Sequence, residues 1–206
     1  MNAVEATPAP TLREQQAEVT RERIMSAMAD LITTEHPSEI SIDAVAGAAG
    51  VAQRTVFRHF PNREALLNGF ASWVHRRLHT DDDPAQPTSP AALARATRVY
   101  FPRFEVNGAI LRAIRSIRLS RELAERRRES RKQYIATAVE SLTHDLDEAD
   151  ATRVRAVLHL LASSDAFFSM QDNYGLDSHE AAEAVVWAID TLADRVKRTK
   201  RARGSA

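Results

Sequence analysis

The sequence predicts an all-α protein of two domains, in which an N-terminal three-helix domain with a helix-turn-helix precedes a larger helical domain. Apolar residues recur at intervals of three and four along most of the chain, and alternating runs of β-branched residues are missing. Six glycines and eight prolines in 206 residues are too few for a turn-rich sandwich or barrel. An acidic, proline-rich stretch, TDDDPAQPTSP at 80–90, predicts the boundary between the two domains.

The composition excludes several kinds of site. The chain has no cysteine, which excludes disulfides, thiolate metal sites and a cysteine nucleophile. Lysine plus arginine and aspartate plus glutamate each number 28, so the net charge is zero. This balance excludes a uniformly basic nucleic-acid-binding coat, whereas a local basic face remains compatible with it.

The sequence also lacks the motifs of common catalytic and membrane proteins. We find no glycine-rich phosphate loop, nucleophile elbow or histidine cluster, so we expect no enzymatic activity, no cofactor and no metal. No run of eighteen apolar residues occurs, and the N-terminus has no apolar signal segment. We therefore expect a cytoplasmic protein that makes no contact with a membrane.

The N-terminal domain is expected to cover 18–66, after a polar, disordered arm over 1–17. Its first helix is predicted to begin at Thr20, which is a plausible N-cap for the apolar pattern that follows. Asn62 is predicted to cap a longer connecting helix that continues to about residue 80.

Two short helices inside this domain carry the most informative pattern. Ser41 is expected to cap the first of them, and Gly50 supplies a turn in which a positive φ angle is expected. In the second short helix, Val56 and Phe60 are expected to point into the core. The side chains that remain face outward: Gln53, Arg54, Thr55, Phe57, Arg58 and His59.

This outward face has the chemistry of a nucleic-acid contact. Residues 51–63 contain three arginines and no acid, and arginine, glutamine and threonine supply donors for phosphates and base edges. Other interpretations remain open at this point. Phe57 is also compatible with the core, His59 with a helix-end cap, and the two outward arginines with a solvated face.

The stretch VAGAAGVAQRTVFRHFPNREALL at 45–67, with the helix TRERIMSAMADLI at 20–32, resembles the Tet repressor (TetR-like) family of bacterial transcriptional regulators. The resemblance implies a DNA-binding helix-turn-helix domain followed by a helical effector-binding and dimerisation domain over 90–200. It also implies a repressor that binds a palindromic operator as a homodimer and that a small molecule releases.

The resemblance assigns roles to individual residues of the first domain. Arg63 takes the place of a lysine that contacts phosphate, while Phe57 replaces the more common tyrosine and lacks its hydroxyl group. Ala52 replaces the usual serine, so a side-chain N-cap worth about 1 kcal/mol is missing. The residues expected at the DNA are Ser41, Gln53, Arg54, Thr55, Phe57, Arg58, His59 and Arg63.

The second domain is predicted to consist of amphipathic helices, the last of them started by a capping box of Asp177 and Glu180. The expected helical segments are 91–105, 109–119, 120–146, 150–172 and 177–199.

Apolar stripes on the last two segments predict the dimer interface. In the family that the chain resembles, the final two helices of each subunit form a four-helix interface, and such a pair holds two recognition helices about 34 Å apart. The alternative is that both stripes pack inside one subunit. The residues assigned to the interface are Val154, Leu158, Leu161, Phe168, Val185, Ile189, Leu192 and Val196.

Large apolar side chains of the second domain predict a pocket for an apolar or amphipathic effector, although each residue is also compatible with plain hydrophobic core. The candidates are Phe101, Phe104, Ile110, Ile114, Phe167, Met170 and Trp187. Two rival functions are an effector-independent DNA-binding dimer and a helical enzyme. A second domain without any cavity would favour the first, and measured turnover or a bound metal would favour the second.

Overall fold

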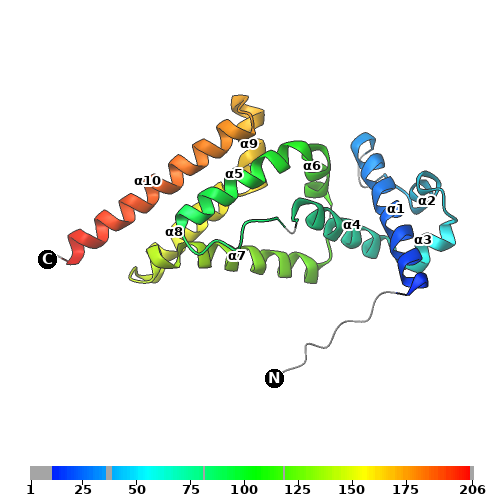
Figure 1. Cartoon of the computed structure of the whole chain (residues 1–206), viewed down its shortest axis with the longest axis horizontal. Coiled ribbons are helices and arrows are strands. Elements are labelled where there is room, and N and C mark those ends of the chain that lie inside the picture. The colour runs from blue at the N-terminus through cyan, green and yellow to red at the C-terminus, as the bar shows by residue number, and fades with distance from the viewer. Residues whose placement is uncertain (1–10, 36–38, 81, 118, 205–206) are drawn as a thin grey trace, which may run out of the picture. The chain divides into compact units, whose positions relative to one another are not determined.

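A computed structural model describes residues 11–35, 39–80, 82–117 and 119–204. Every regular element in these ranges is a helix, which confirms the predicted all-α class. The helices are α1 (Leu12–Thr34), α2 (Ile42–Ala49), α3 (Gln53–His59), α4 (Arg63–Leu78), α5 (Pro90–Val106), α6 (Gly108–Ser116), α7 (Arg121–Thr143), α8 (Glu148–Leu161), α9 (Ser164–Tyr174) and α10 (Ser178–Gly204), as drawn in Figure 1.

The described residues divide into two compact units. The first unit contains the residues up to Trp73 together with Arg112–Arg118, and the second contains Val74–Leu111 and the residues from Leu119 onward. The division therefore falls inside α4, whereas the sequence predicted a boundary in the proline-rich stretch at 80–90. Within the described ranges, no helix combines the length and the hydropathy that a membrane span requires.

The first helix begins eight residues earlier than predicted. Thr11 is its N-cap: the Thr11 Oγ1 accepts a hydrogen bond from the Glu14 amide at 3.3 Å, and the Thr11 amide donates to Glu14 Oε2 at 2.7 Å. The hydroxyl of Thr20, the predicted cap, instead donates to the Gln16 carbonyl at 2.8 Å inside the helix. Residues 12–17 are therefore helical rather than disordered, and residues 1–10 of the expected arm lie outside the described residues.

The first unit is built around a core of α1, α2, α3 and the first part of α4. Ile24 and Met25 of α1 are buried, and the Trp73 Nε1 donates to the Glu22 carboxylate at 2.8 Å. The Arg21 guanidinium lies 4.6 Å from the centre of the Phe60 ring, in cation–π geometry. These contacts fix α1 beside the helix-turn-helix.

In the second unit α5 and α10 run side by side and make its most extensive helix packing (Figure 1). The predicted capping box at the start of α10 is confirmed, because Asp177 Oδ1 accepts from the Glu180 amide at 2.8 Å and the Asp177 amide donates to Glu180 Oε2 at 3.0 Å. The largest fully buried side chains of this unit are Leu93, Phe101, Leu158, Phe167, Phe168 and Ile189.

The prediction of a single helix over 150–172 is wrong. Two helices, α8 and α9, occupy this range, and the chain breaks at Ala162 and Ser163. Ser163 caps α9 by accepting from the Ala166 amide at 3.2 Å, while its own hydroxyl donates to the Leu160 carbonyl at 2.6 Å. The serine competes with the helical backbone for hydrogen bonds, which explains the break.

Candidate nucleic-acid interface

The helix-turn-helix forms by local interactions that the sequence predicts. The Ser41 Oγ accepts from the Ala44 amide at 3.0 Å and caps α2, and Gly50 ends it in the left-handed region at φ 62°. The Asn62 Oδ1 accepts from the Ala65 amide at 2.7 Å and caps α4. Ala52 precedes α3 without a side-chain cap, as expected from its missing hydroxyl group.

Helix α3 divides its side chains sharply between core and solvent. Val56 and Phe60 are buried, at 0% and 1% exposure, which confirms their predicted inward direction. Gln53, Arg54 and Arg58 are exposed. Among the described residues, neither of these two arginines forms an ion pair that would neutralise it. The exposed face of α3 is therefore cationic and rich in hydrogen-bond donors.

The two aromatic rings of α3 differ in their accessibility. Phe57 is 42% exposed, which argues against the alternative that it belongs to the core. His59 is half-buried, and burial, followed by the charges of Arg58 and Arg21, lowers its pKa. Its Nε2 is buried and has no hydrogen-bond partner among the described residues, so a phosphate contact from this atom would require the ring to move.

The remaining residues predicted at the DNA have other partners in the structure. Thr55 is half-buried, and Ser41 is exposed while its hydroxyl caps α2. The Arg63 Nη1 donates to the Ile40 carbonyl and joins the start of α4 to the segment before α2. A phosphate contact from Arg63 would therefore compete with this internal hydrogen bond.

Two arginines of α1 that hold the helix-turn-helix in place were not predicted from the sequence. The Arg23 Nη2 donates to the Ala49 carbonyl at 2.8 Å and closes the end of α2. Arg21 covers the buried Phe60 ring at the end of α3. Their spacing on α1 follows no cap or motif, so only their contacts with distant residues identify these roles.

Three phenylalanines among the residues predicted for the effector site lie close together in the second unit. The ring centre of Phe167 lies 5.4 Å from that of Phe101 and 6.3 Å from that of Phe104. Ile110 and Met170 are half-buried. The clustering of these rings agrees with a hydrophobic core as well as with an effector site.

Two of the predicted pocket residues do not fit that cluster. Trp187 is 72% exposed on α10, so its assignment to a buried pocket is corrected. Ile114 is half-buried and belongs to the first unit, whereas the three phenylalanines belong to the second. The neighbouring helices cover Val186 and Ile189 of α10 but leave Trp187 exposed.

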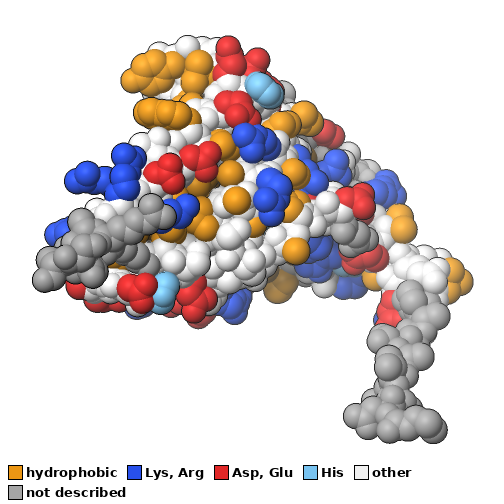
Figure 2. Space-filling model, turned by 60° about the vertical axis from the view of Figure 1, so that its left-hand side comes forward, with side chains coloured by type: hydrophobic (Ala, Val, Ile, Leu, Met, Phe, Trp, Pro, Cys, Tyr) orange, Lys and Arg blue, Asp and Glu red, His pale blue; other side chains and the backbone are white. Residues whose placement is uncertain are grey.

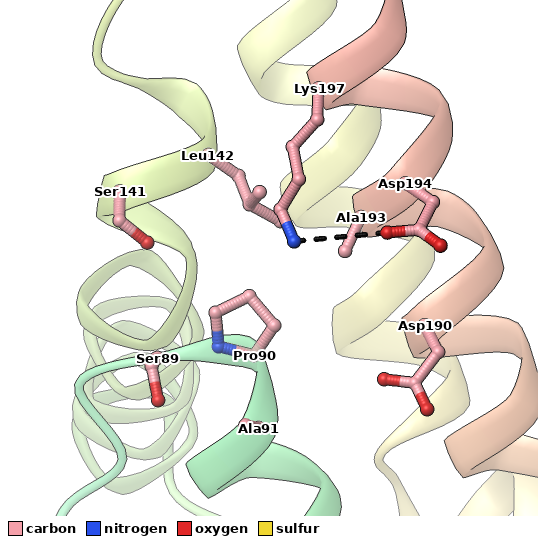
Figure 3. A pocket seen from close by; sticks show the side chains of 9 residues that line it. All are labelled: Ser89, Pro90, Ala91, Ser141, Leu142, Asp190, Ala193, Asp194 and Lys197. Carbon is pink, nitrogen blue, oxygen red and sulfur yellow. Dashed lines mark ion pairs between the residues drawn. The ribbon is translucent and has the colours of Figure 1, made fainter.

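A groove of about 620 Å³ lies elsewhere in the second unit, between the start of α5, the end of α7 and α10 (Figure 3). Lys197 and Asp194 pair across 3.7 Å at its edge. None of the predicted pocket residues lines this groove. Its lining residues are Ser89, Pro90, Ala91, Ser141, Leu142, Asp190, Ala193, Asp194 and Lys197.

Most of the residues predicted at the dimer interface are buried within a single chain, so the alternative of intrasubunit packing describes them better. Helices α5, α7, α8, α9 and α10 of the same unit cover them. Leu161 and Leu192 are half-buried, so part of their surface remains exposed in the single chain. The buried residues are Val154, Leu158, Phe168, Val185, Ile189 and Val196.

Other apolar side chains, which lie on α8 and α10, do face outward. Val157 and Leu160 on α8 are 47% and 61% exposed, and Trp187 on α10 is the third member of this set. Exposed hydrophobic side chains also gather near the end of the unit where α9 meets α10 (Figure 2). We call Val157, Leu160 and Trp187 the outward apolar face.

Comparison with known proteins agrees with the geometry of the first unit. Residues 24–69 match the family model described as bacterial regulatory proteins, tetR family. The regulator AlkX of Mycobacterium tuberculosis is 35% identical over 82 residues, which cover 38% of this chain and 39% of that protein. The repressor LfrR of Mycolicibacterium smegmatis is 32% identical over 102 residues, which cover 50% and 53%. The chain thus spans from two fifths to about half of the length of these relatives.

Solved structures extend the likeness in fold to most of the chain. A tetR-family transcriptional regulator from Streptomyces coelicolor superposes with a TM-score of 0.67 at 20% identity, covering 91% of this chain and 86% of that one. NalD of Pseudomonas aeruginosa superposes with a TM-score of 0.65 at 20% identity, covering 86% and 96%. The helix-turn-helix of this chain thus matches the tetR family of bacterial regulatory proteins, and the fold of most of the chain is that of solved TetR-family regulators.

Proposed function

We propose that this protein is a transcriptional repressor that binds a palindromic operator as a homodimer and is released by a small-molecule effector. The observation that carries the proposal is the division of α3, in which Val56 and Phe60 anchor the helix while Arg54 and Arg58 face solvent. Exposed guanidinium groups on a short helix of this kind fit the phosphates and guanine edges of a major groove. The relative LfrR is itself named a repressor.

A dimer follows from the limits of one short helix. The single α3 spans residues 53–59 and makes too few contacts for specific binding, whereas two copies about 34 Å apart read both halves of a palindrome. We assign the contact between subunits to the outward apolar face, together with the exposed parts of Leu161 and Leu192. Large exposed apolar side chains on packed helices are typical of such interfaces.

We propose that the effector binds to the second unit, near the three clustered phenylalanines Phe101, Phe104 and Phe167. A ligand that binds one arrangement of the dimer better than another shifts the population between them, and the spacing of the two α3 helices then changes. A repressor of a bacterial chromosome acts in the cytoplasm, so we assign the protein to that compartment.

The decisive experiment is genomic footprinting of the purified protein, followed by gel retardation on the recovered site. Arg54→Ala and Arg58→Ala are each expected to weaken operator binding by about 5- to 150-fold, the effect of losing one bidentate base contact. The matched control is Arg126→Ala, on an exposed position of α7, which is expected to bind like the wild type. Wild-type affinity in both α3 variants would contradict the proposed function.

A further inference from the structure

His59, the last residue of α3, has a ring nitrogen that the protein leaves unused. Its Nε2 is buried and has no hydrogen-bond partner among the described residues. The ring centre of His59 lies 6.4 Å from that of the buried Phe60, while the preceding residue, Arg58, is exposed. A buried nitrogen without a partner has lost its hydrogen bonds to water, so an outside group that pairs with it gains stability.

The charges around His59 are mainly positive and oppose its protonation. The Arg21 guanidinium of α1 lies 4.6 Å from the centre of the Phe60 ring, which His59 also contacts. Burial, followed by the charges of Arg58 and Arg21, lowers the pKa of His59 below its ordinary value of 6.5. The Glu18 carboxylate, also on α1, acts in the opposite direction and is the smallest of these effects. The imidazole is therefore mainly neutral at pH 7 in the free protein.

The other helices of the first unit's core supply no further counter-charge. Helix α2 has one titratable residue, Asp43, and the part of α4 in the first unit has two, Arg63 and Glu64. None of these three residues is among the groups that shift the pKa of His59. The anion that would stabilise a protonated His59 must therefore come mainly from outside the chain.

A phosphate of the operator is such an anion. In the proposed complex the exposed face of α3, with Arg54 and Arg58, lies against the DNA, where phosphate oxygens accept hydrogen bonds. Phosphates offset the arginine charges and favour the imidazolium form of His59, which can donate from Nε2 once the ring rotates outward. The coupling is reciprocal: the phosphate raises the proton affinity of His59, and the proton raises its affinity for the phosphate.

We propose that His59 binds an operator phosphate as the imidazolium ion, so that each subunit takes up a proton from solvent when the repressor binds DNA. This inference rests on the proposed function and adds a dependence of DNA binding on pH. Operator affinity rises as the pH falls from the pKa of His59 in the complex to its lower pKa in the free protein, by up to about tenfold per pH unit for each subunit. Outside this interval His59 has the same charge in both states, and its contribution is constant.

The first test measures the proton directly in the wild-type full chain. Calorimetric titration with the footprinted operator is run at pH 7 in phosphate and in Tris, two buffers that differ in their heat of ionisation. The difference between the two binding heats gives the number of protons exchanged, and net uptake is expected. Equal heats in the two buffers, or proton release, would overturn the inference.

The second test assigns the proton to His59. His59→Gln keeps a hydrogen-bond donor at the position of Nε2 but cannot titrate, so it is expected to lose the proton uptake. In gel retardation at constant ionic strength, the wild type is expected to gain about tenfold or more in affinity between pH 8 and pH 6, and the variant much less. The matched control is His179→Gln, at an exposed position of α10, which is expected to keep the wild-type response.

His59→Asn serves as a second variant if glutamine disturbs the half-buried site. A variant that folds and keeps the full pH response would contradict the assignment to His59. The same preparations separate the two proposals. Failure of the wild type to bind the recovered site at either pH contradicts the proposed function, whereas tight binding without proton uptake contradicts this inference alone.

Discussion

Arg23 on α1 and Gly50 at the end of α2 are in close contact, because a Cβ atom at Gly50 would lie 3.2 Å from the Arg23 Nη2. The same nitrogen donates to the Ala49 carbonyl at 2.8 Å. Gly50 itself has a φ angle of 62°, which L-residues rarely adopt. The turn before the recognition helix therefore depends both on a glycine backbone and on an arginine that approaches it closely.

The first prediction concerns this turn. Gly50→Ala is expected to lower the free energy of unfolding by about 1–2 kcal/mol, because an L-residue is strained in the left-handed region. The matched control is Gly47→Ala, inside α2, where a Cβ meets nothing within 4 Å. Alanine is expected to stabilise that position by up to about 1 kcal/mol. Urea denaturation of both variants measures the difference, and equal stability of the two would contradict the argument.

The second prediction concerns the packing of α4 on α3. A Cβ at Gly69 would lie 2.5 Å from Cε1 of the buried Phe60 ring, so Gly69→Ala is expected to destabilise the protein by about 1–3 kcal/mol. The double variant with Phe60→Leu removes the opposing ring atoms. It is expected to lose less stability than the two single variants together, as a double-mutant cycle will show. Simple additivity would refute a steric clash between these positions.

The third prediction concerns Asp83, which joins the segment after α4 to α5 through Arg103 and Tyr100. Partial burial would raise the pKa of this carboxyl group, but hydrogen bonds from Thr80, Arg103, Tyr100 and His79 hold it well below its ordinary value. Asp83→Asn is expected to lower the free energy of unfolding by about 1.5–3 kcal/mol at pH 7.

The pH dependence of this effect has a definite sign. A depressed pKa in the folded state means that the carboxylate contributes its full stability above the ordinary value of 3.8 and loses it as the pH falls below that value. The difference between wild type and Asp83→Asn should therefore be constant from pH 5 to 8 and shrink in more acidic solution. The exposed Asp82→Asn is the control, and the same loss in both variants would rule out the network as the cause.

The fourth prediction concerns the outward apolar face. Trp187→Glu places a charge at an exposed position of α10 and is expected to weaken the proposed dimer at least tenfold, because large buried aromatic residues dominate interface energies. Val106→Glu is the matched control, since Val106 is 86% exposed at the end of α5. Analytical ultracentrifugation measures the dissociation constants. A wild-type dimer in Trp187→Glu, or equal effects of both substitutions, would exclude this face as the interface.

The sequence by itself determined the features that depend on neighbouring residues. Ser41, Gly50 and Asn62 set the ends of the short helices because each acts on backbone groups within four positions. The inward direction of Val56 and Phe60 follows from the helical repeat. The capping box at Thr11 also depends only on neighbouring residues. It was missed because the helix start was predicted from the apolar pattern, which begins near Thr20.

Only the tertiary structure decided which apolar residues of each helix pack against another helix and which remain exposed. Phe168 and Val185 are buried inside the chain while Trp187 remains exposed, although the helical repeat alone allowed each of them at an interface. The internal hydrogen bond of Arg63 to Ile40 and the hydrogen bonds of Asp83 with Tyr100 and Arg103 likewise join residues more than fifteen positions apart. Such contacts depend on how helices cross in space, and the period of a single helix contains no information about its neighbours.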